Sequence, residues 1–233
     1  MTVSIDELCE RLDVRKVLPS EYRRFIRRVE RKGASMEEQA RMFDGHALPP
    51  TQVMAPLISE RLSGAETVVE LGFGTGFRLL YYALNHHTTQ FVAVDNNPLV
   101  REVVVDRMDR LGVRNVRLET RDMFELPLEP RKFSCVLAID CIPETLPPYL
   151  KGRITYQQFL AANQIRFSQM VDGSKSPSFY TTVDYAGFKP EYQTAMERWV
   201  QEGGLKRVEA VPFEWKKREE PTKRGTLLVA SSG

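Results

Sequence analysis

The amino-acid sequence predicts an α/β protein in which a helical segment precedes a largely parallel β-sheet. From Thr67 onward, short apolar runs of strand length alternate with amphipathic stretches of helical length, which is typical of βαβ units. In the first sixty residues, apolar side chains instead recur at steps of three and four residues, which indicates helices. The last two apolar runs are separated only by KKREEPTKRG, so we expect an antiparallel hairpin at a sheet edge.

The helical segment is expected to form a cap on the α/β part. Helical spacing is seen in two stretches of apolar side chains, first Ile5, Leu8 and Leu12, then Tyr22, Phe25, Ile26 and Val29. Residues 46–56, HALPPTQVMAP, hold three prolines and are expected to be an extended connector, after which a further helix reaches Leu62. We therefore expect a helical cap or lid over residues 1–64 and an α/β domain over residues 65–233.

The elements of the α/β part follow from its alternating pattern. Strands are predicted at Thr67–Leu71, Gln90–Asp95, Val116–Thr120, Phe133–Asp140, Ser178–Val183, Val208–Trp215 and Thr226–Ser231. Helices are predicted near Phe77–Asn85, Leu99–Leu111, Tyr156–Val171 and Glu191–Gln201.

Composition excludes several classes of protein. With 42% hydrophobic and 27% charged residues, the chain is unlike disordered, collagen-like or disulfide-stapled proteins. Its 33 basic and 31 acidic side chains leave a net charge of +2, too small to attract nucleic acid or a membrane over the whole surface. A run of arginines from Arg23 to Arg31 could meet phosphates, but a solvated helix face is the simpler interpretation.

Three cysteines, Cys9, Cys135 and Cys141, form no CxxC pair, which favours a reducing compartment. No apolar run approaches the roughly 20 residues that cross a bilayer, and the N-terminal residues lack the apolar segment of a signal peptide. We therefore expect a cytoplasmic protein without a membrane partner.

The most informative stretch is VVELGFGTGF, residues 68–77, where a strand leads through Gly72, Gly74 and Gly76 into a helix. Glycine accepts positive φ and has no Cβ, so such a turn lets a ligand approach the backbone at a helix N-terminus. A nucleotide-like ligand is indicated. Taken alone, the motif fits a tight strand-to-helix turn without a ligand equally well.

Two further strand ends favour an adenosine site. Asp95 ends the next predicted strand, nineteen residues beyond Gly76, where a carboxylate can accept hydrogen bonds from both ribose hydroxyls. Asp122 and Met123 follow the third strand, where a carboxylate can accept from the adenine amino group and an apolar side chain can cover the ring. Polar groups from three strand ends would thus meet at one edge of the sheet.

The segments ELGFGTG, AVDNNP, TRDMF and FSCVLAIDCIPETL resemble the ordered motifs of the class I S-adenosylmethionine-dependent methyltransferases, over about residues 65–231. The resemblance implies a seven-stranded, mostly parallel sheet with one antiparallel edge strand and helices on both faces. It also implies S-adenosylmethionine as cofactor. The residues that would bind it are Glu70, Gly72, Gly74 and Gly76 at the methionine portion, Asp95 and Asn96 at the ribose, Asp122 and Met123 at the adenine, and Asp140 at the methionine amino group.

Two other classes of enzyme use similar motifs. An NAD-dependent reductase has the spacing GxGxxG, whereas Phe77 stands at the third glycine position here and would obstruct helix-to-strand packing. An aminopropyltransferase resembling spermidine synthase shares the fold and the acidic residues. Such enzymes usually have a β-rich N-terminal domain and a Gly-Asp pair after the third strand, where this chain has a helical start and Arg121-Asp122.

Methyl transfer from a sulfonium needs in-line approach of an acceptor atom, so positioning and desolvation supply most of the rate. Asp140 is the candidate general base, with binding of the cofactor amino group as its equally credible role. Residues 140–143, DCIP, stand where amino-methylating nucleic-acid enzymes carry Asn/Asp-Pro-Pro-aromatic, which argues against N6-adenine methylation. The candidate acceptor-binding residues, in loops after the fourth and fifth strands, are Glu144, Tyr156, Asp184 and Tyr185.

We expect a small-molecule acceptor. An RNA or protein acceptor, engaged by the arginine run and the basic hairpin, and a non-catalytic binding protein are the alternatives. His46, His86 and His87 show no metal-ligand spacing, so we predict no metal. The sequence leaves the acceptor atom and the oligomeric state open.

Overall fold

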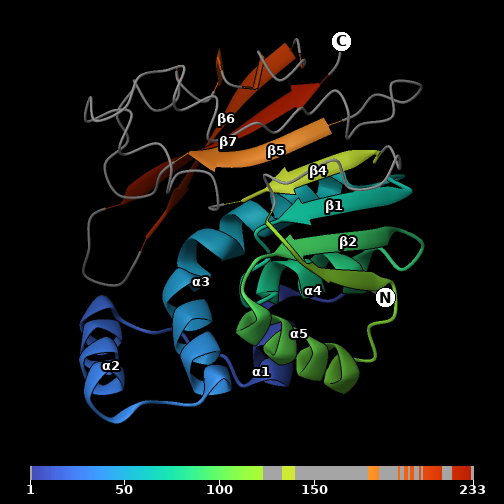
Figure 1. Ribbon diagram of the computed structural model, residues 1–233. Helices are drawn as coiled ribbons and strands as arrows, with labels where there is room; N and C mark the ends of the chain where they lie inside the picture. Colours follow the sequence, from blue (N-terminus) through green and yellow to red (C-terminus); the bar gives the residue numbers. More distant parts are fainter. Residues whose placement is uncertain are drawn as a thin grey trace.

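The computed structural model describes residues 2–122, 133–139, 194, 197–198, 200–201, 205, 207–216 and 222–231, and the main chain of residues 178–183. Three helices come first, and strands and helices then alternate from Thr67 to Thr120 (Figure 1). The helices are α1 (Ile5–Leu12), α2 (Pro19–Lys32), α3 (Met36–Arg61), α4 (Phe77–Asn85) and α5 (Pro98–Leu111). The strands are β1 (Thr67–Leu71), β2 (Gln90–Asp95), β3 (Val116–Thr120), β4 (Cys135–Ala138), β5 (Ser178–Val183), β6 (Arg207–Trp215) and β7 (Lys223–Ser231).

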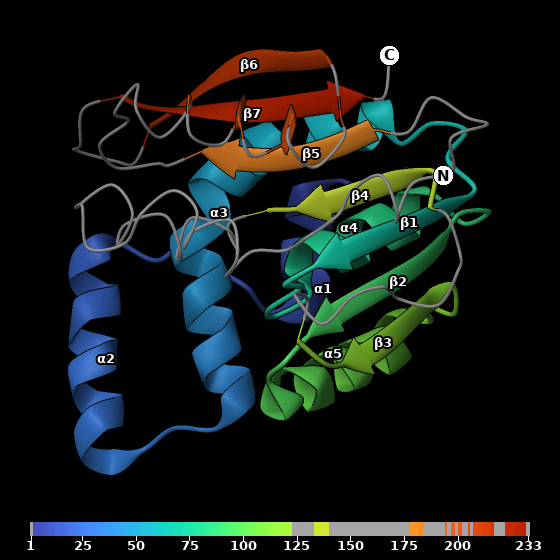
Figure 2. The same cartoon turned by 45° about the horizontal axis from the view of Figure 1, so that its top comes forward.

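The strands pair in the order β3-β2-β1-β4-β5-β7-β6 (Figure 2). Strands β1 to β5 run parallel to one another, and β7 is antiparallel to both β5 and β6. The predicted parallel α/β sheet and its C-terminal hairpin are confirmed. Because the sheet reverses order between β1 and β4, the carboxyl ends of these strands leave a crevice of the kind in which open α/β sheets bind ligands.

The prediction of an antiparallel edge strand is wrong in one respect, because the reversed strand β7 lies inside the sheet and β6 forms its edge. Pro212, in the middle of β6, has no N–H to donate to a neighbouring strand, and within sheets proline occurs mainly in edge strands such as β6. Strand β7 instead carries a continuous buried run, Gly225–Leu228, as expected for a strand with neighbours on both sides.

The predicted extended connector at residues 46–56 is also wrong, because α3 is helical throughout Met36–Arg61 and includes Pro49, Pro50 and Pro56. A proline cannot donate to the carbonyl four residues earlier, which leaves the main-chain oxygen of Gly45 without its helical donor at Pro49. The N–H of Val17 donates to that oxygen instead, at 2.9 Å. A contact from the segment before α2 thus satisfies a group that the proline leaves unpaired.

The N-terminal helices share one core with the α/β part. Side chains of α1, α3 and α4 belong to the same buried cluster as those of β1 and β2, and α3 contacts α2, α4, α5 and β6. The side-chain oxygen of Asn85, at the end of α4, accepts from the N–H of Val3 at 2.8 Å, and its amide donates to the oxygen of Val3 at 3.0 Å. The predicted boundary near residue 64 stays a prediction, while these contacts attach the helical segment firmly to α4.

Helices α4 and α5 cover one face of the sheet (Figure 1). The two further predicted helices, Tyr156–Val171 and most of Glu191–Gln201, lie outside the described residues. Within the described part of the chain, no helix combines the length and the hydropathy that crossing a bilayer requires.

Candidate functional site

The glycine-rich turn between β1 and α4 adopts the conformation that its glycines allow. Gly72, Gly74 and Gly76 have φ values of 68°, 51° and 72°, all in the left-handed region that favours glycine. A Cβ on Gly76 would lie 2.5 Å from Cγ2 of Val104, so this glycine is needed for packing against α5. A Cβ on Gly74 would meet no atom within 4 Å, so the space above Gly74 is open to a ligand.

Asp95 at the end of β2 is held against this turn through both of its carboxylate oxygens. Its Oδ2 accepts from the N–H of Gly74 at 2.9 Å, and its Oδ1 accepts from the N–H of Asn97 at 3.0 Å. The N–H of Gly72 donates to the oxygen of Val94 at 2.7 Å, which extends the same connection between β1 and β2. The half-buried carboxylate is therefore fixed in orientation and has capacity left to accept further hydrogen bonds.

A cavity of about 490 Å³ lies over these strand ends. The predicted site residues that line it are Gly72, Gly74, Asp95, Asn96 and Asp122. Four more come from α3, namely Phe43, Asp44, Ala47 and Thr51, and others include Thr75, Arg78 and Ile139. The structure thus brings together polar groups from the ends of β1, β2 and β3, as the sequence predicts, and adds a wall supplied by α3.

Glu70 does not line the cavity, although the sequence places it beside the methionine portion. Its side chain is buried in β1, and neither carboxylate oxygen has a hydrogen-bond partner among the described residues. Burial raises the pKa of Glu70 to about 7, with Arg78 lowering this pKa and Asp95 raising it further. This carboxyl group, two residues before the glycine turn, is therefore protonated more readily than that of an ordinary glutamate.

Arg78, in the first turn of α4, faces the end of β4. Its Nη2 donates to the main-chain oxygen of Ile139 at 3.1 Å, and both residues line the cavity. Asp140 follows Ile139 in the sequence but lies outside the described residues, as do five other predicted site residues, namely Met123, Glu144, Tyr156, Asp184 and Tyr185. Their roles stay predictions.

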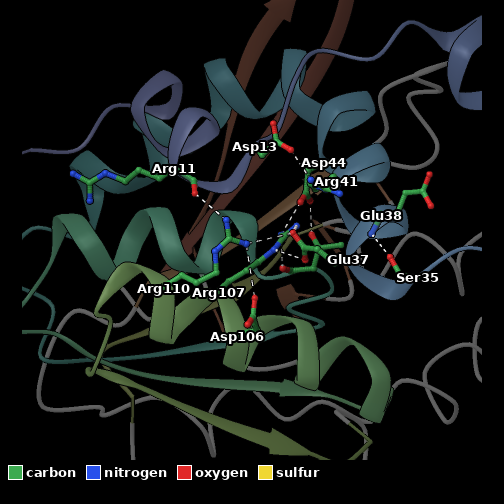
Figure 3. A network of polar contacts seen from close by, with 11 residues as sticks. Arg11, Asp13, Ser35, Glu37, Glu38, Arg41, Asp44, Asp106, Arg107 and Arg110 are labelled. Atoms are coloured by element: carbon green, nitrogen blue, oxygen red, sulfur yellow. Dashed lines mark hydrogen bonds and ion pairs between the residues drawn. The ribbon is translucent and has the colours of Figure 1, made fainter.

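Sequence reasoning missed a group of buried polar residues behind the glycine turn. Arg107 of α5 donates to Asp44 of α3 (Figure 3). Asp44 also accepts from the hydroxyl of Thr75, and Arg107 donates to the main-chain oxygen of Thr75. Asp44 lies 63 residues from Arg107 in the chain, and no local pattern marks the pair. The available signal in the sequence was the spacing of Arg107, which follows Val103 and Val104 by four and three residues and so shares their face of α5. An arginine on a buried helix face is almost never fully buried unless it is paired.

The described residues fit an adenosine-containing cofactor. The turn offers an open approach at Gly74, an oriented carboxylate stands at the end of β2, and Asp122 follows β3 in the same cavity wall. Residues 68–153 match the family model described as "Methyltransferase domain". Residues 68–153 are therefore similar to a methyltransferase domain. The matched range holds the glycine turn, Asp95 and Asp122, which are the residues that the geometry brings together.

Solved methyltransferases share the fold of this domain. The S-adenosylmethionine-dependent methyltransferase SibL in its apo form is 16% identical, with a TM-score of 0.60, over 97% of this chain and 69% of that one. Magnesium protoporphyrin IX methyltransferase from Synechocystis PCC 6803 is 14% identical, with a TM-score of 0.53, over 88% of both chains. An S-adenosylmethionine-dependent O-methyltransferase from Thermotoga maritima is 12% identical, with a TM-score of 0.52, over 76% of this chain.

At these identities the likeness establishes the fold alone. The chain spans 63% of the Thermotoga maritima protein and 39% of EvdMO1, so it corresponds to only part of those longer chains. No curated protein matches the sequence.

Proposed function

We propose that this chain is an S-adenosylmethionine-dependent methyltransferase that transfers a methyl group to a small-molecule acceptor by direct in-line displacement. The observation that carries the proposal is the position of Asp95. Its carboxylate is held by the N–H of Gly74 and lines the same cavity as Asp122. A ribose and an adenine can be recognised together only when the ends of β2 and β3 face one ligand site.

Residues at the strand ends would bind the cofactor through hydrogen bonds and close backbone approach. Gly72 and Gly74 allow close approach of the methionine portion, Asp95 and Asn96 accept from and donate to the ribose, and Asp122 accepts from the adenine amino group. Met123 would cover the adenine ring, and Asp140 would supply negative charge near the methionine ammonium. When bound, S-adenosylmethionine supplies a methyl group that its sulfonium has already activated.

Because the cofactor's methyl group is already activated, the protein has only to orient the acceptor and to exclude water. Helix α3 supports this role because its apolar side chains Phe43 and Ala47 line the cavity. We propose Asp140 as the base that removes a proton from a hydroxyl or ammonium acceptor. The proposed acceptor contacts are Glu144, Tyr156, Asp184 and Tyr185.

The similar solved structures support a small acceptor, and the strand order supports the class I architecture. One neighbour is described as a magnesium protoporphyrin IX methyltransferase and another as an O-methyltransferase. The strand order β3-β2-β1-β4-β5-β7-β6 supports assignment of the full chain to the seven-stranded class I sheet. We infer a compact acceptor that enters beside α3.

The experiment combines cofactor binding with methyl transfer. Calorimetry is expected to show binding of S-adenosylhomocysteine and no binding of NAD. Radiolabelled methyl groups from S-adenosylmethionine should then appear in a small-metabolite fraction rather than in RNA or protein. Transfer of an aminopropyl group from decarboxylated S-adenosylmethionine would instead establish the aminopropyltransferase, and label in RNA would establish the polymer-directed enzyme.

The alternative of an RNA acceptor can be tested separately, by changing the arginines of α2. Arg23, Arg24 and Arg27 are exposed, whereas Arg28 pairs with Glu38 and lies over the ring of Phe25. For a small acceptor, neutralising these arginines should leave turnover unchanged. Salt-sensitive loss of turnover would favour a polymer instead.

A further inference from the structure

Arg107 of α5 is a buried cation whose partners come from two other parts of the fold. Its side chain is 0% exposed. Nη1 donates to Oδ2 of Asp44 at 2.7 Å, and Nε donates to Oε2 of Glu37 at 3.3 Å (Figure 3). Nη1 also donates to the main-chain oxygen of Thr75 at 3.0 Å. A guanidinium in this position is tolerated only because acidic and carbonyl oxygens surround it.

Asp44 of α3 uses both of its carboxylate oxygens in this arrangement. Oδ2 accepts from Arg107, and Oδ1 accepts from the hydroxyl of Thr75 at 2.5 Å. Burial raises the pKa of Asp44, while Arg107 and the Thr75 hydroxyl lower it. The carboxylate also lines the cavity, so it lies at the boundary between the helical segment and the candidate cofactor site.

Thr75 is therefore held at two atoms, its hydroxyl by Asp44 and its main-chain oxygen by Arg107. It stands between Gly74 and Gly76, whose missing side chains leave the turn few other restraints. The N–H of Gly74 in turn donates to Asp95. A continuous series of polar contacts thus runs from α3 through the turn to the carboxylate proposed to hold the ribose.

We propose that Asp44 is a positioning residue for the cofactor turn, acting through Thr75 and supported by Arg107. The helical segment would then do more than cover the cavity, because it orders the turn before a ligand arrives and lowers the entropic cost of binding. Asp44 lies outside the matched methyltransferase range of residues 68–153, whereas Thr75 and Arg107 lie inside it. This inference rests on the proposed function.

The first test changes Thr75, because its substitution leaves both buried charges in place. Thr75→Val removes the hydroxyl and keeps the side-chain shape, and it is expected to weaken S-adenosylhomocysteine binding about tenfold by calorimetry. Thr75→Ser retains the hydroxyl and should restore wild-type affinity. The matched control is Thr89→Val, because Thr89 is buried and donates its hydroxyl to the oxygen of Ala65 at 2.7 Å, away from the cavity. This control should leave affinity unchanged.

The second test asks whether Asp44 acts through Thr75. Asp44→Asn keeps the shape of the side chain, and it should weaken S-adenosylhomocysteine binding and raise KM for the cofactor more than it lowers kcat. The combined Asp44→Asn and Thr75→Val variant should bind no more weakly than the weaker-binding of the two single variants, because both changes act on the same contact. If Asp44→Asn does not fold, the Thr75 series decides the question.

Three results would overturn the inference. Thr75→Val could bind as tightly as the wild type, the Thr89→Val control could lose as much affinity, or the two changes could prove additive. Absence of S-adenosylhomocysteine binding in the wild-type chain is a distinct result. It would overturn the proposed function, and the inference with it.

Discussion

The main-chain N–H of Gly74 donates to Oδ2 of Asp95 at 2.9 Å, so the glycine turn and the end of β2 form one unit before any ligand binds. A carboxylate oriented in this way loses little freedom when it accepts ribose hydroxyls.

Asp95→Ala is expected to weaken S-adenosylhomocysteine binding at least tenfold, because hydrogen bonds to the ribose are lost. Calorimetry with the purified variant measures this change. The matched control is Asp106→Ala, since Asp106 is an exposed carboxylate on α5 whose nearest cation is Arg110 at 3.8 Å. Wild-type affinity in the Asp95 variant would show that the ribose lies elsewhere.

Gly74→Val is expected to abolish or weaken cofactor binding at least tenfold while the chain still folds. The new side chain meets no protein atom near its Cβ, so it occupies space that the ligand needs. The positive φ of 51° adds a strain of about 1–2 kcal/mol to the folded state. Circular dichroism checks folding and calorimetry checks binding, and a folded variant that binds normally would contradict the assignment of the turn.

Gly76→Ala is expected to destabilise the fold, because its Cβ would lie 2.5 Å from Cγ2 of Val104. Gly112 is the matched control, because its φ of 70° is similar and no atom lies within 4 Å of its added Cβ. Gly112→Ala should lower the free energy of unfolding by about 1 kcal/mol from backbone strain alone. Gly76→Ala should lower the free energy of unfolding, measured with urea, by about 2 kcal/mol more than Gly112→Ala does. Adding Val104→Ala to the Gly76→Ala variant should restore part of that free energy.

Glu70 is expected to make stability depend on pH. Its pKa is raised from 4.5 to about 7 in the folded chain, so folding favours the protonated carboxyl group. The stabilising effect of that protonated form is complete below pH 4.5 and is lost as pH rises through about 7. Glu70→Gln should remove this dependence and be more stable than the wild type by about 3 kcal/mol above pH 7. Urea unfolding of both chains from pH 4 to 8 tests this, and parallel profiles would contradict it.

Arg107→Ala is expected to lower the free energy of unfolding by about 3–5 kcal/mol, because it leaves Asp44 as an unpaired buried charge. Arg110, one turn further along α5, is 43% exposed and lies 3.9 Å from Glu37, so Arg110→Ala should cost less than about 1 kcal/mol. Chemical denaturation of the two variants gives the comparison. Equal losses would show that burial of Arg107 contributes nothing beyond a surface ion pair.

The local sequence pattern was sufficient to predict most of the strands and the glycine turn. The predicted strands at Thr67–Leu71, Gln90–Asp95 and Val116–Thr120 agree with β1, β2 and β3, and the predicted helix at Phe77–Asn85 agrees with α4. Apolar periodicity, glycine and strand-end carboxylates act over a few residues, so these features can be read without knowing the neighbours in space.

Other features depended on partners far apart in the chain. Pro49 is accommodated within α3 because Val17 donates to the oxygen of Gly45, and Pro212 fits β6 because that strand forms the edge. Asp44 reaches Thr75 and Arg107 only after α3 packs beside α5. A hydrogen bond that replaces one removed by proline, or a charge that neutralises a buried arginine, can come from any distant segment. Which distant segment supplies that partner is decided only by tertiary packing. The secondary structure and the glycine turn, in contrast, follow from the preferences of residues that are close together in the sequence.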